Sequence, residues 1–494
     1  MSEERKTIYL CLAHMSEDGV EQKYVKEAFD TNWVVPMGPN VNAFEEDLEN
    51  FVNNVHSYEN ENEDKNRRLD RTVVCLSAGT AAVHLALIGC GVQVGDEVCV
   101  QSFTFCASSH PITYVGAKPV FIDSEPQTWN MDPELLEKAI IDRREKTGKY
   151  PKAIIPVALY GMPDRIDRIM AVADNYGIPV IEDAAEGFGS RYDGQVLGTF
   201  GRYGVLSFNG NKMITTSGGG ALICHDAVDK KNVVYYATQA RVAYPYYHHQ
   251  NIGFNYRLSN VCAGIGIGQM TVADAHIAHH KRVQGLYEKL LADVPGVHVH
   301  CQPADGRFDS NYWLCTITLD ADVHVVGQEN VYKEVITKAV GGAAGVLQIP
   351  DSPVTDCQPN DNVEALRDFM DKADIEARPV WKPMHKHPVY CEGAEEVPFA
   401  GASASSGAAG CGCGTGDGAV GSGAGCGAEV GSGAAGCGCG AGAGVRCFEG
   451  PKMVAYVNGV SDAVFKVGMC LPAGPYVTDS DVEYIVQSIK EAIK

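Results

Sequence analysis

Short apolar runs alternate with segments of helical periodicity between residues 72 and 224. The runs that predict strands cover 72–76, 97–100, 119–122, 153–158 and 179–181. Helices are expected between them, at 81–90, 108–115, 133–147 and 165–176. This alternation predicts an α/β fold with a mostly parallel central sheet that helices cover on both faces. In such sheets a ligand binds at the carboxyl ends of the strands.

The chain has 494 residues, enough for two domains with full hydrophobic cores. We expect a large domain over 1–287 and a smaller C-terminal α+β domain over 288–494, which follows a long helical region at 260–286. The last segment, 479–494, predicts an amphipathic helix. Its apolar side carries Val482, Ile485, Val486, Ile489 and Ile493.

Residues 401–446 differ in kind from the rest, because Gly, Ala, Ser and Cys dominate them. The nine residues Ser406–Gly414 recur unchanged as Ser432–Gly440. Such a composition cannot bury a core, so we expect a loose loop inserted in the small domain. Two Cys-Gly-Cys pairs raise the possibility of a metal site, but their spacing differs from Cys-x2-Cys and no histidine lies between them. We therefore expect no metal.

Composition excludes several classes of protein. A formal net charge of −22 argues against a general nucleic-acid surface, which needs clustered Lys and Arg. No run approaches the roughly 18 apolar residues of a membrane span, and no apolar segment behind the N-terminus indicates a secretory signal. The chain has 18 cysteines, and those outside residues 401–450 stand singly among apolar residues. This pattern favours reduced, buried thiols in a cytoplasmic enzyme.

The segment Ser207–Gly220 places Lys212 in a polar, glycine-flanked loop between two apolar runs. A lysine desolvated there loses its proton and can attack an aldehyde to form a Schiff base. The loop alone fits a surface hairpin with a solvated lysine equally well. Asp183, which ends an upstream apolar run, favours the Schiff-base interpretation of Lys212 over the surface hairpin. A pyridoxal phosphate enzyme needs a carboxylate at such a place to keep the pyridine nitrogen protonated.

Three further elements fit the same cofactor. Gly79 and Thr80 follow a strand and open a helix, so their amides and the Thr80 hydroxyl could bind a phosphate. Phe105 follows the second strand and could stack on an aromatic ring, although a core position is the ordinary alternative. Ser207 is spaced to touch a phosphate while Lys212 reaches the aldehyde. The plain alternative for Asp183 is a helix N-cap.

The motifs Ser77–Thr80, Glu182–Glu186, Ser207–Lys212 and Gly253–Asn260 occur together. With them the chain resembles the DegT/StrS-type nucleotide-sugar aminotransferases, which are fold type I pyridoxal phosphate enzymes. The resemblance covers 8–270 and returns at 374–387 and 458–494, which is most of the chain. The 401–446 insertion has no counterpart in that pattern.

Further motifs at 29–33, 123–126, 215–220 and 381–385 resemble one branch of this family. That branch makes UDP-4-amino sugars of the bacillosamine type for protein glycosylation. The resemblance implies transfer of an amino group from an amino acid, expected to be L-glutamate, to a UDP-linked 4-keto-6-deoxy sugar. The same chemistry on a GDP- or dTDP-linked 3- or 4-ketosugar stays open, as does a non-catalytic partner protein with a vestigial site.

Carried over position by position, the resemblance assigns a role to each candidate residue. Lys212 would bind the cofactor aldehyde and move the proton, and Asp183 would pair with the pyridinium nitrogen. Glu186 stands where the family often has Gln against the ring's phenolic oxygen, so a carboxylate there must be protonated or make another contact. The remaining assignments are Gly79, Thr80 and Ser207 to the phosphate, Phe105 to the ring, Trp381, Lys382 and His385 to the substrate, and Asn255 to the cofactor phosphate of a neighbouring subunit. The last of these implies a homodimer with shared active sites.

Overall fold

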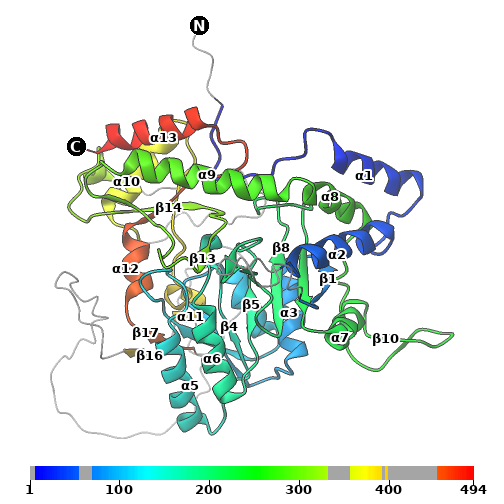
Figure 1. Cartoon of the computed structure of the whole chain (residues 1–494). Coiled ribbons are helices and arrows are strands. Elements are labelled where there is room, and N and C mark those ends of the chain that lie inside the picture. Colours follow the sequence, from blue (N-terminus) through cyan, green and yellow to red (C-terminus); the bar gives the residue numbers. More distant parts are fainter. Residues whose placement is uncertain (1–5, 55–68, 332–356, 392–394, 399–452, 494) are drawn as a thin grey trace, which may run out of the picture.

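The computed structural model describes residues 6–54, 69–331, 357–391, 395–398 and 453–493. Two sheets organise it, and helices surround both (Figure 1). In the described helices no segment is long and apolar enough to cross a membrane. The repeated Gly/Ala/Ser/Cys segment and its Cys-Gly-Cys pairs lie outside the described residues.

The central sheet has the strand order β1-β9-β8-β5-β4-β2-β3-β17-β16. Parallel bridges from Ile154 to Val180 and from Val157 to Asp183 join its two halves across β4 and β5. Only β9 runs antiparallel to its neighbours among these strands, which confirms the mostly parallel sheet. The strands are β1 (Thr72–Leu76), β2 (Glu97–Gln101), β3 (Lys118–Ile122), β4 (Ala153–Ile155), β5 (Ile181–Asp183), β8 (Tyr203–Ser207), β9 (Gly220–Cys224), β16 (Glu395–Pro398) and β17 (Val454–Val457).

Side chains alternate between the two faces of this sheet, and a separate hydrophobic cluster covers each face. In β1, Val73 and Cys75 join one cluster while Val74 and Leu76 join the other. The first cluster holds apolar residues of α2 (Pro39–Val52), α5 (Pro133–Thr147) and α6 (Ile166–Tyr176). The second holds those of α3 (Gly79–Gly89), α4 (His110–Tyr114) and α7 (Ala227–Ala237). Helices therefore cover both faces, as the sequence predicts.

A smaller antiparallel sheet follows the order β12-β14-β18-β15. Its strands are β12 (Val297–Val299), β14 (Cys315–Leu319), β15 (Arg378–Pro379) and β18 (Gly468–Leu471). Helices α9 (Ala273–Leu291), α10 (Asp361–Lys372) and α13 (Asp479–Ala492) pack on it and form a third apolar cluster. All five residues expected on the apolar side of the last helix belong to this cluster or pack against it.

A single domain boundary at residue 288 does not separate the segments of the large sheet from those of the small sheet. Strands β16 and β17 follow that position, yet they extend the central sheet at β3. In the other direction, Ile8 pairs with Ile375 beside the small sheet. Helix α9 crosses the predicted boundary and ends at Leu291. The two-domain division stays a prediction, and the strands that return to the large sheet are a feature that the sequence pattern did not indicate.

Most predicted elements lie where expected, and their ends shift by a few residues. The helix predicted at 133–147 matches α5, which Asp132 caps through two backbone N–H groups. The strand predicted at 153–158 ends at Ile155, and the one predicted at 179–181 lies at β5. The helix expected at 108–115 is a short 3-10 turn, Cys106–Ser108, followed by α4. The helical region at 260–286 is two helices, α8 (Asn260–Met270) and α9.

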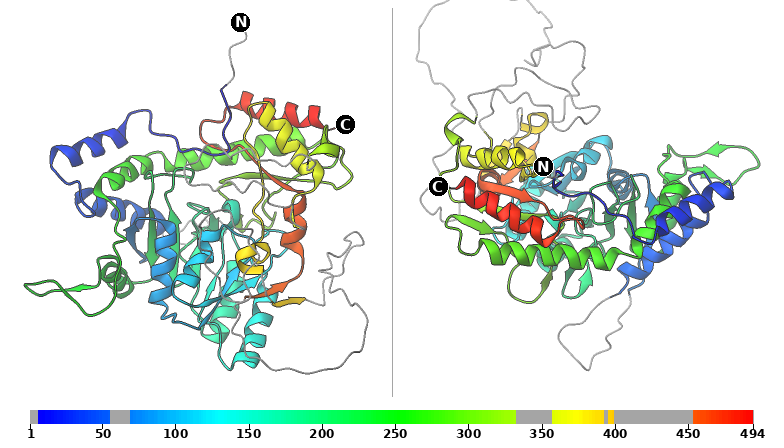
Figure 2. Two further views of the ribbon diagram at one scale, coloured as in Figure 1. Left: turned by 180° about the vertical axis from the view of Figure 1, so that it is seen from behind. Right: turned by 90° about the horizontal axis from the view of Figure 1, so that it is seen from above.

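The remaining elements lie at the periphery. Helices α1 (Val20–Asp30), α2 and α8 pack together at one side, and the hairpin of β10 (Arg241–Val242) and β11 (His248–His249) projects from the body (Figures 1 and 2). The short elements are β6 (Arg191–Tyr192), β7 (Gln195–Val196), β13 (Phe308–Asp309), α11 (Pro388–Cys391), α12 (Val460–Val467) and 3-10 turns at Leu159–Gly161, Gln328–Asn330 and Met384–Lys386.

Asp123 joins the two parts of the chain. Its fully buried carboxylate accepts hydrogen bonds from the backbone N–H groups of Ser124, Asn458, Gly459 and Ser461, at 2.8–3.1 Å. These bonds fix the turn between β17 and α12 to the carboxyl end of β3. The resemblance to other sequences singled out residues 123–126, and the structure gives Asp123 a structural role.

Replacing Asp123 by Ala should leave four backbone donors without their acceptor and destabilise the protein by about 3 kcal/mol or more. Urea unfolding followed by circular dichroism measures this as a lower midpoint. The control is Asp18→Ala, which changes an exposed carboxylate and should stay within about 0.5 kcal/mol of the parent. Equal midpoints for the two variants would contradict the structural role of Asp123.

Candidate functional site

The predicted chemistry gathers at one edge of the central sheet. Strands β1, β2, β5 and β8 run in the same direction, so their carboxyl ends meet at this edge. The antiparallel β9 begins there, which brings Gly218 and Gly219 to the same place. The segments that carry Gly79, Phe105, Asp183 and Lys212 each follow one of these strands or end it, as the rule for open α/β sheets requires.

A cavity of about 380 Å³ opens at this edge. Eight of the predicted residues line it: Gly79, Thr80, Phe105, Asp183, Glu186, Ser207, Lys212 and Trp381. The other lining residues are Ser77, Ala78, Val83, Thr104, Ala107, Ser108, Val157, Ala185, Val205, Asn209, Asn211, Gly218, Gly219 and Trp313. The structure thus brings together residues that are widely separated in the sequence, from Ser77 to Trp381.

Lys212 lies in the loop between β8 and β9, and its backbone is fixed on several sides. Its N–H donates to the carbonyl of Asn209 (3.0 Å), and the indole N–H of Trp313 donates to the carbonyl of Asn211 (2.7 Å). The side chain is 13 % exposed. Its Nζ lies 4.0 Å from the centre of the Trp313 ring. The amine is therefore held at the wall of the cavity with a small exposed fraction, and it is not the solvated surface lysine of the alternative interpretation.

Asp183 ends β5 with its carboxylate in the cavity wall. Ser108 Oγ donates to Oδ2 (2.6 Å), and the Ala185 N–H donates to Oδ1 (3.2 Å). Thr104 Oγ1 lies 2.8 Å from Ser108 Oγ and extends this chain of hydroxyls. Burial raises the pKa of Asp183, while the bond from Ser108 and the charge of Lys212 oppose that rise. A cationic group bound in the cavity would relieve the cost of this buried charge.

Glu186 is 4 % exposed and makes two contacts. Its Oε2 accepts from the N–H of Tyr160 (2.8 Å), and its Oε1 lies 3.4 Å from Lys212 Nζ. Burial raises the pKa of Glu186, and the charge of Lys212 opposes the rise. The Tyr160 N–H and the Lys212 amine are therefore the partners of this carboxylate in the cavity wall.

The first turn of α3 faces the cavity. Ala78, at its N-cap, has an extended backbone and makes no side-chain cap bond within the described part of the chain. The leading N–H groups of the helix are therefore available to an anion, which the helix dipole also favours. A Cβ on Gly79 would lie 3.2 Å from Ser207 Cβ, and one on Gly220 would lie 2.4 Å from Gly79 N. Glycine at these positions lets the helix, β8 and β9 approach closely enough to form one anion cradle.

Three lining residues were missed by the sequence interpretation. Trp313 comes from the small-domain side, Ser108 bonds to Asp183, and Asn211 precedes Lys212. The Oδ1 of Asn211 and the Nε1 of Trp381 are buried and have no hydrogen-bond partner among the described residues. The position next to Lys212 could have indicated Asn211, but no local pattern could place Trp313, because its contact depends on the tertiary fold.

Two histidines of α9 hold the loops on either side of the lysine. His276 Nδ1 donates to the carbonyl of Met213 (3.3 Å), and His280 Nδ1 donates to the carbonyl of Tyr312 (3.1 Å). Burial lowers the pKa of both imidazoles, to about 3 in His280. Both are therefore neutral at physiological pH and act as hydrogen-bond donors to backbone.

Three predicted residues do not line the cavity. His385, expected to contact substrate, is buried at 2 % exposure, with Nδ1 2.6 Å from Ser102 Oγ and Nε2 3.3 Å from Asp462 Oδ1. It fastens the Trp381 segment to the end of β2 and to α12. Lys382 is half-buried outside the cavity lining. Asn255 is exposed, and its Oδ1 accepts from Gln239 Nε2 (3.2 Å).

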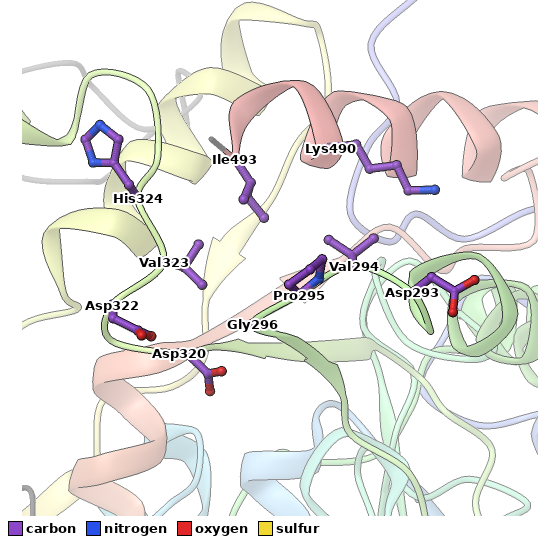
Figure 3. A pocket seen from close by; sticks show the side chains of 10 residues that line it. All are labelled: Asp293, Val294, Pro295, Gly296, Asp320, Asp322, Val323, His324, Lys490 and Ile493. Carbon is purple, nitrogen blue, oxygen red and sulfur yellow. The ribbon is translucent and has the colours of Figure 1, made fainter.

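A second hollow, of about 620 Å³, shares no lining residue with this cavity (Figure 3). The end of α13, the turn before β12 and the loop after β14 surround it, and it holds none of the predicted residues. Its lining is Asp293, Val294, Pro295, Gly296, Asp320, Asp322, Val323, His324, Lys490 and Ile493. The lining has no nucleophile with a paired base, so the smaller cavity is the candidate active site.

No metal cluster occurs in the part of the chain that the structure describes. Seven of the cysteines described there are buried, and all of those described are free thiols. Burial raises the pKa of Cys11 to about 12, so this thiol near Lys212 stays protonated. The buried thiols agree with the reading of the cysteines as reduced core residues.

The cavity fits pyridoxal phosphate by its own chemistry. The Lys212 amine can bind an aldehyde, and the buried Asp183 carboxylate can pair with a protonated ring nitrogen. The N-terminus of α3, beside Ser207, can bind a phosphate. The unpaired Asn211 Oδ1 and Trp381 Nε1 provide further polar contacts. Phe105, 48 % exposed, lies 5.5 Å from the Trp381 ring and completes an aromatic wall.

Comparison with known proteins agrees with this geometry. Residues 15–344 match the DegT/DnrJ/EryC1/StrS aminotransferase family. EpsN of Bacillus subtilis, assigned as a pyridoxal phosphate-dependent aminotransferase, is 41 % identical over 78 % of this chain and 84 % of its own length. The GDP-perosamine synthase of Escherichia coli O157:H7 is 32 % identical over 79 % of this chain and 90 % of its own.

A solved structure carries the same fold. The DegT DnrJ EryC1 StrS aminotransferase of Brucella abortus superposes with a TM-score of 0.68 at 22 % identity, over 96 % of this chain and 95 % of that one. The expected architecture, a fold type I aminotransferase with a parallel central sheet and a smaller antiparallel sheet, is confirmed. The chain belongs to the DegT/DnrJ/EryC1/StrS family and is a pyridoxal phosphate-dependent sugar aminotransferase.

Proposed function

We propose that this enzyme transfers an amino group from L-glutamate to a nucleotide-linked ketosugar for glycan biosynthesis. The observation that carries the proposal is the placement of Lys212 in one cavity with Asp183 and a free helix N-terminus. The sugar-synthase relatives support a nucleotide-sugar acceptor.

When bound, pyridoxal phosphate supplies an aldehyde and a ring that stabilises negative charge. Lys212 Nζ would be the nucleophile for that aldehyde and, as a free amine, would take a proton from the substrate carbon and pass it to a second carbon. The Asp183 carboxylate would keep a ring nitrogen protonated, and Ser108 holds this carboxylate in place. Gly79, Thr80 and Ser207 would hold the phosphate at the start of α3.

Lys212→Ala should abolish amino transfer while the protein stays folded, because nucleophile and proton carrier are lost together. We expect a fall of at least about 10³-fold in the rate, since general acid–base catalysis alone contributes roughly 10²–10⁴-fold. The rate of 2-oxoglutarate release measures it, with circular dichroism as the control for folding. Transfer close to the wild-type rate would refute the role of Lys212.

The nucleotide sugar is proposed to be a UDP-linked 4-keto-6-deoxy sugar. The sequence motifs at 29–33, 123–126, 215–220 and 381–385 support this choice, and the GDP-perosamine synthases among the relatives favour a GDP-linked sugar as the alternative. Phe105 and Trp381 form an aromatic wall with an unpaired indole N–H, a surface that suits a sugar with polar edges.

Incubation with L-glutamate and a panel of UDP-, dTDP- and GDP-linked 4-keto-6-deoxy sugars tests the choice. We expect the UDP sugar to give an amino sugar with a kcat/KM at least about tenfold above the others, because a nucleobase site discriminates by hydrogen bonds that a wrong base leaves unpaired. Product mass identifies the transfer. Preference for the GDP sugar would replace this substrate assignment and leave the aminotransferase assignment intact.

We propose further that the enzyme is a homodimer with shared sites. Asn255 is exposed and lies outside the cavity of its own subunit. Beside it in sequence, the β10–β11 hairpin projects from the body (Figures 1 and 2). The hairpin exposes Tyr246 and Tyr247 by 65 % and 79 %, and Ile252, which follows it, is 88 % exposed. Large exposed apolar side chains on a projecting arm are typical of an interface. On a second subunit this arm would bring Asn255 to the partner's phosphate cradle.

Mixing two inactive variants tests the shared site. In the proposed dimer each site uses Lys212 of its own subunit and Asn255 of the other subunit. A hybrid of one Lys212→Ala subunit and one Asn255→Ala subunit therefore has one site with both residues intact. Refolding or subunit exchange of the mixture should restore about a quarter of the parent activity, while each variant alone stays low. Sedimentation gives the oligomeric state. A monomer in solution, or a mixture without recovery, would contradict the proposal.

A further inference from the structure

Tyr160 connects the cavity wall to the segment that leaves the small sheet, although Tyr160 itself does not line the cavity. It is buried in the 3-10 turn Leu159–Gly161, which follows β4. Its backbone N–H donates to Glu186 Oε2 (2.8 Å), and its hydroxyl accepts from the backbone N–H of Trp381 (2.7 Å). The two polar groups of this one residue thus contact two different walls of the cavity.

The backbone of Tyr160 has an uncommon conformation that the surrounding groups enforce. Its φ of 55° and ψ of 16° are left-handed, a region that non-glycine residues rarely occupy. The carbonyl of the next residue, Gly161, accepts hydrogen bonds from Ser190 Oγ (2.7 Å) and Ser310 Oγ (3.0 Å). A left-handed residue persists only where its surroundings determine it, and such residues cluster at functional sites. The direction in which the Tyr160 side chain leaves the backbone is therefore fixed by the fold.

Trp381 lies where the chain passes from the small sheet to the central sheet. Just before it, the Val380 N–H donates to the carbonyl at the start of β18 (3.2 Å). Just after it, the Met384 N–H donates to the carbonyl of the residue that follows β2 (2.8 Å). Between these two bonds the Trp381 N–H donates to the Tyr160 hydroxyl. This hydroxyl therefore fixes the backbone at the residue whose ring enters the cavity.

The Trp381 ring combines an unpaired donor with an apolar face. It lines the cavity together with Phe105, whose ring centre is 5.5 Å away, and the Tyr160 ring lies beside it with centres 6.0 Å apart. Its indole Nε1 is buried and has no hydrogen-bond partner in the part of the chain that the structure describes. A buried donor without an acceptor is costly, so a bound ligand is expected to supply one. A sugar ring offers an oxygen beside an apolar face, whereas L-glutamate offers two carboxylates and no comparable face.

We propose that Tyr160 is a positioning residue that sets the place of the Trp381 ring and thereby the affinity of the enzyme for its sugar substrate. The proposal rests on the ketosugar acceptor of the proposed function. The Tyr160 N–H contacts Glu186 whatever side chain residue 160 carries, whereas only the hydroxyl holds Trp381. Loss of the hydroxyl should therefore impair the stage of the reaction that uses the sugar and spare the stage that uses L-glutamate.

Tyr160→Phe tests this proposal, because it removes the hydroxyl and keeps the aromatic ring. Steady-state kinetics of the holoenzyme are measured with the nucleotide-linked ketosugar that the parent enzyme uses best. We expect the KM for this sugar to rise about three- to tenfold, the effect of one lost hydrogen bond, while kcat stays within about twofold of the parent. The release of 2-oxoglutarate in a single turnover with L-glutamate should keep the parent rate.

Two further variants are the controls. Tyr287→Phe also removes one buried tyrosine hydroxyl, which donates to the carbonyl of Pro472 (2.9 Å), and it should leave the kinetic constants for both substrates unchanged. Trp381→Phe tests whether Tyr160 acts through Trp381. In that background, adding Tyr160→Phe should raise the KM for the ketosugar by less than about twofold. A full three- to tenfold rise in the double variant would show that Tyr160 acts by another route and would overturn the proposal.

Fluorine NMR of the full-length chain labelled with 5-fluorotryptophan gives a readout without any substrate. The chain has four tryptophans, and the line that is missing in Trp381→Phe belongs to Trp381. This line should shift or broaden in Tyr160→Phe and stay in place in Tyr287→Phe. An unmoved Trp381 line, or an unchanged KM for the ketosugar, would refute the role of Tyr160 alone. A parent enzyme that accepts no ketosugar would refute the proposed function and, with it, the role of Tyr160 in sugar binding.

Discussion

Two carboxylates and one amine share a small cavity from which most water is excluded, and the surrounding structure depends on balancing their charges. Asp183 and Glu186 are each 4 % exposed, and burial raises the pKa of both. Such groups remain ionised only with hydrogen bonds and opposite charge nearby. Ser108 and the Ala185 N–H serve Asp183, while the Tyr160 N–H and Lys212 serve Glu186. Tyr160 has a left-handed backbone conformation (φ 55°), and in that conformation its N–H reaches Glu186.

The sheet places these groups, and the sequence predicts that part well. Strands followed by polar, glycine-containing turns indicate an α/β sheet, and parallel strands necessarily bring their following turns to one edge. Gly79, Asp183, Ser207 and Lys212 were therefore identifiable from local pattern. The ends of β4 and β5 were less predictable, because a short buried strand has no periodicity that fixes its limits.

Contacts that arise only from tertiary packing could not be predicted. Trp313 reaches Lys212 from the segment before β14, and nothing in that segment indicates this contact. His385, predicted to touch substrate, is buried against Ser102 and Asp462, and Ser102 lies 283 positions away in the chain. Strand β17 joins the central sheet from the C-terminal region. A resemblance can indicate that such segments matter, but the side on which each residue points is a property of the packed structure.

The two histidines of α9 have a consequence for the geometry of the active site. His276 and His280 are one helical turn apart, a step of about 6 Å along the axis. One binds the backbone beside Lys212 and the other the backbone beside Trp313. The spacing of the two histidines on the helix thus fixes the separation between the Lys212 amine and the Trp313 ring. An insertion of one residue between the histidines would rotate the second by about 100° and break this spacing, so the length of α9 here is as constrained as the identity of the catalytic residues.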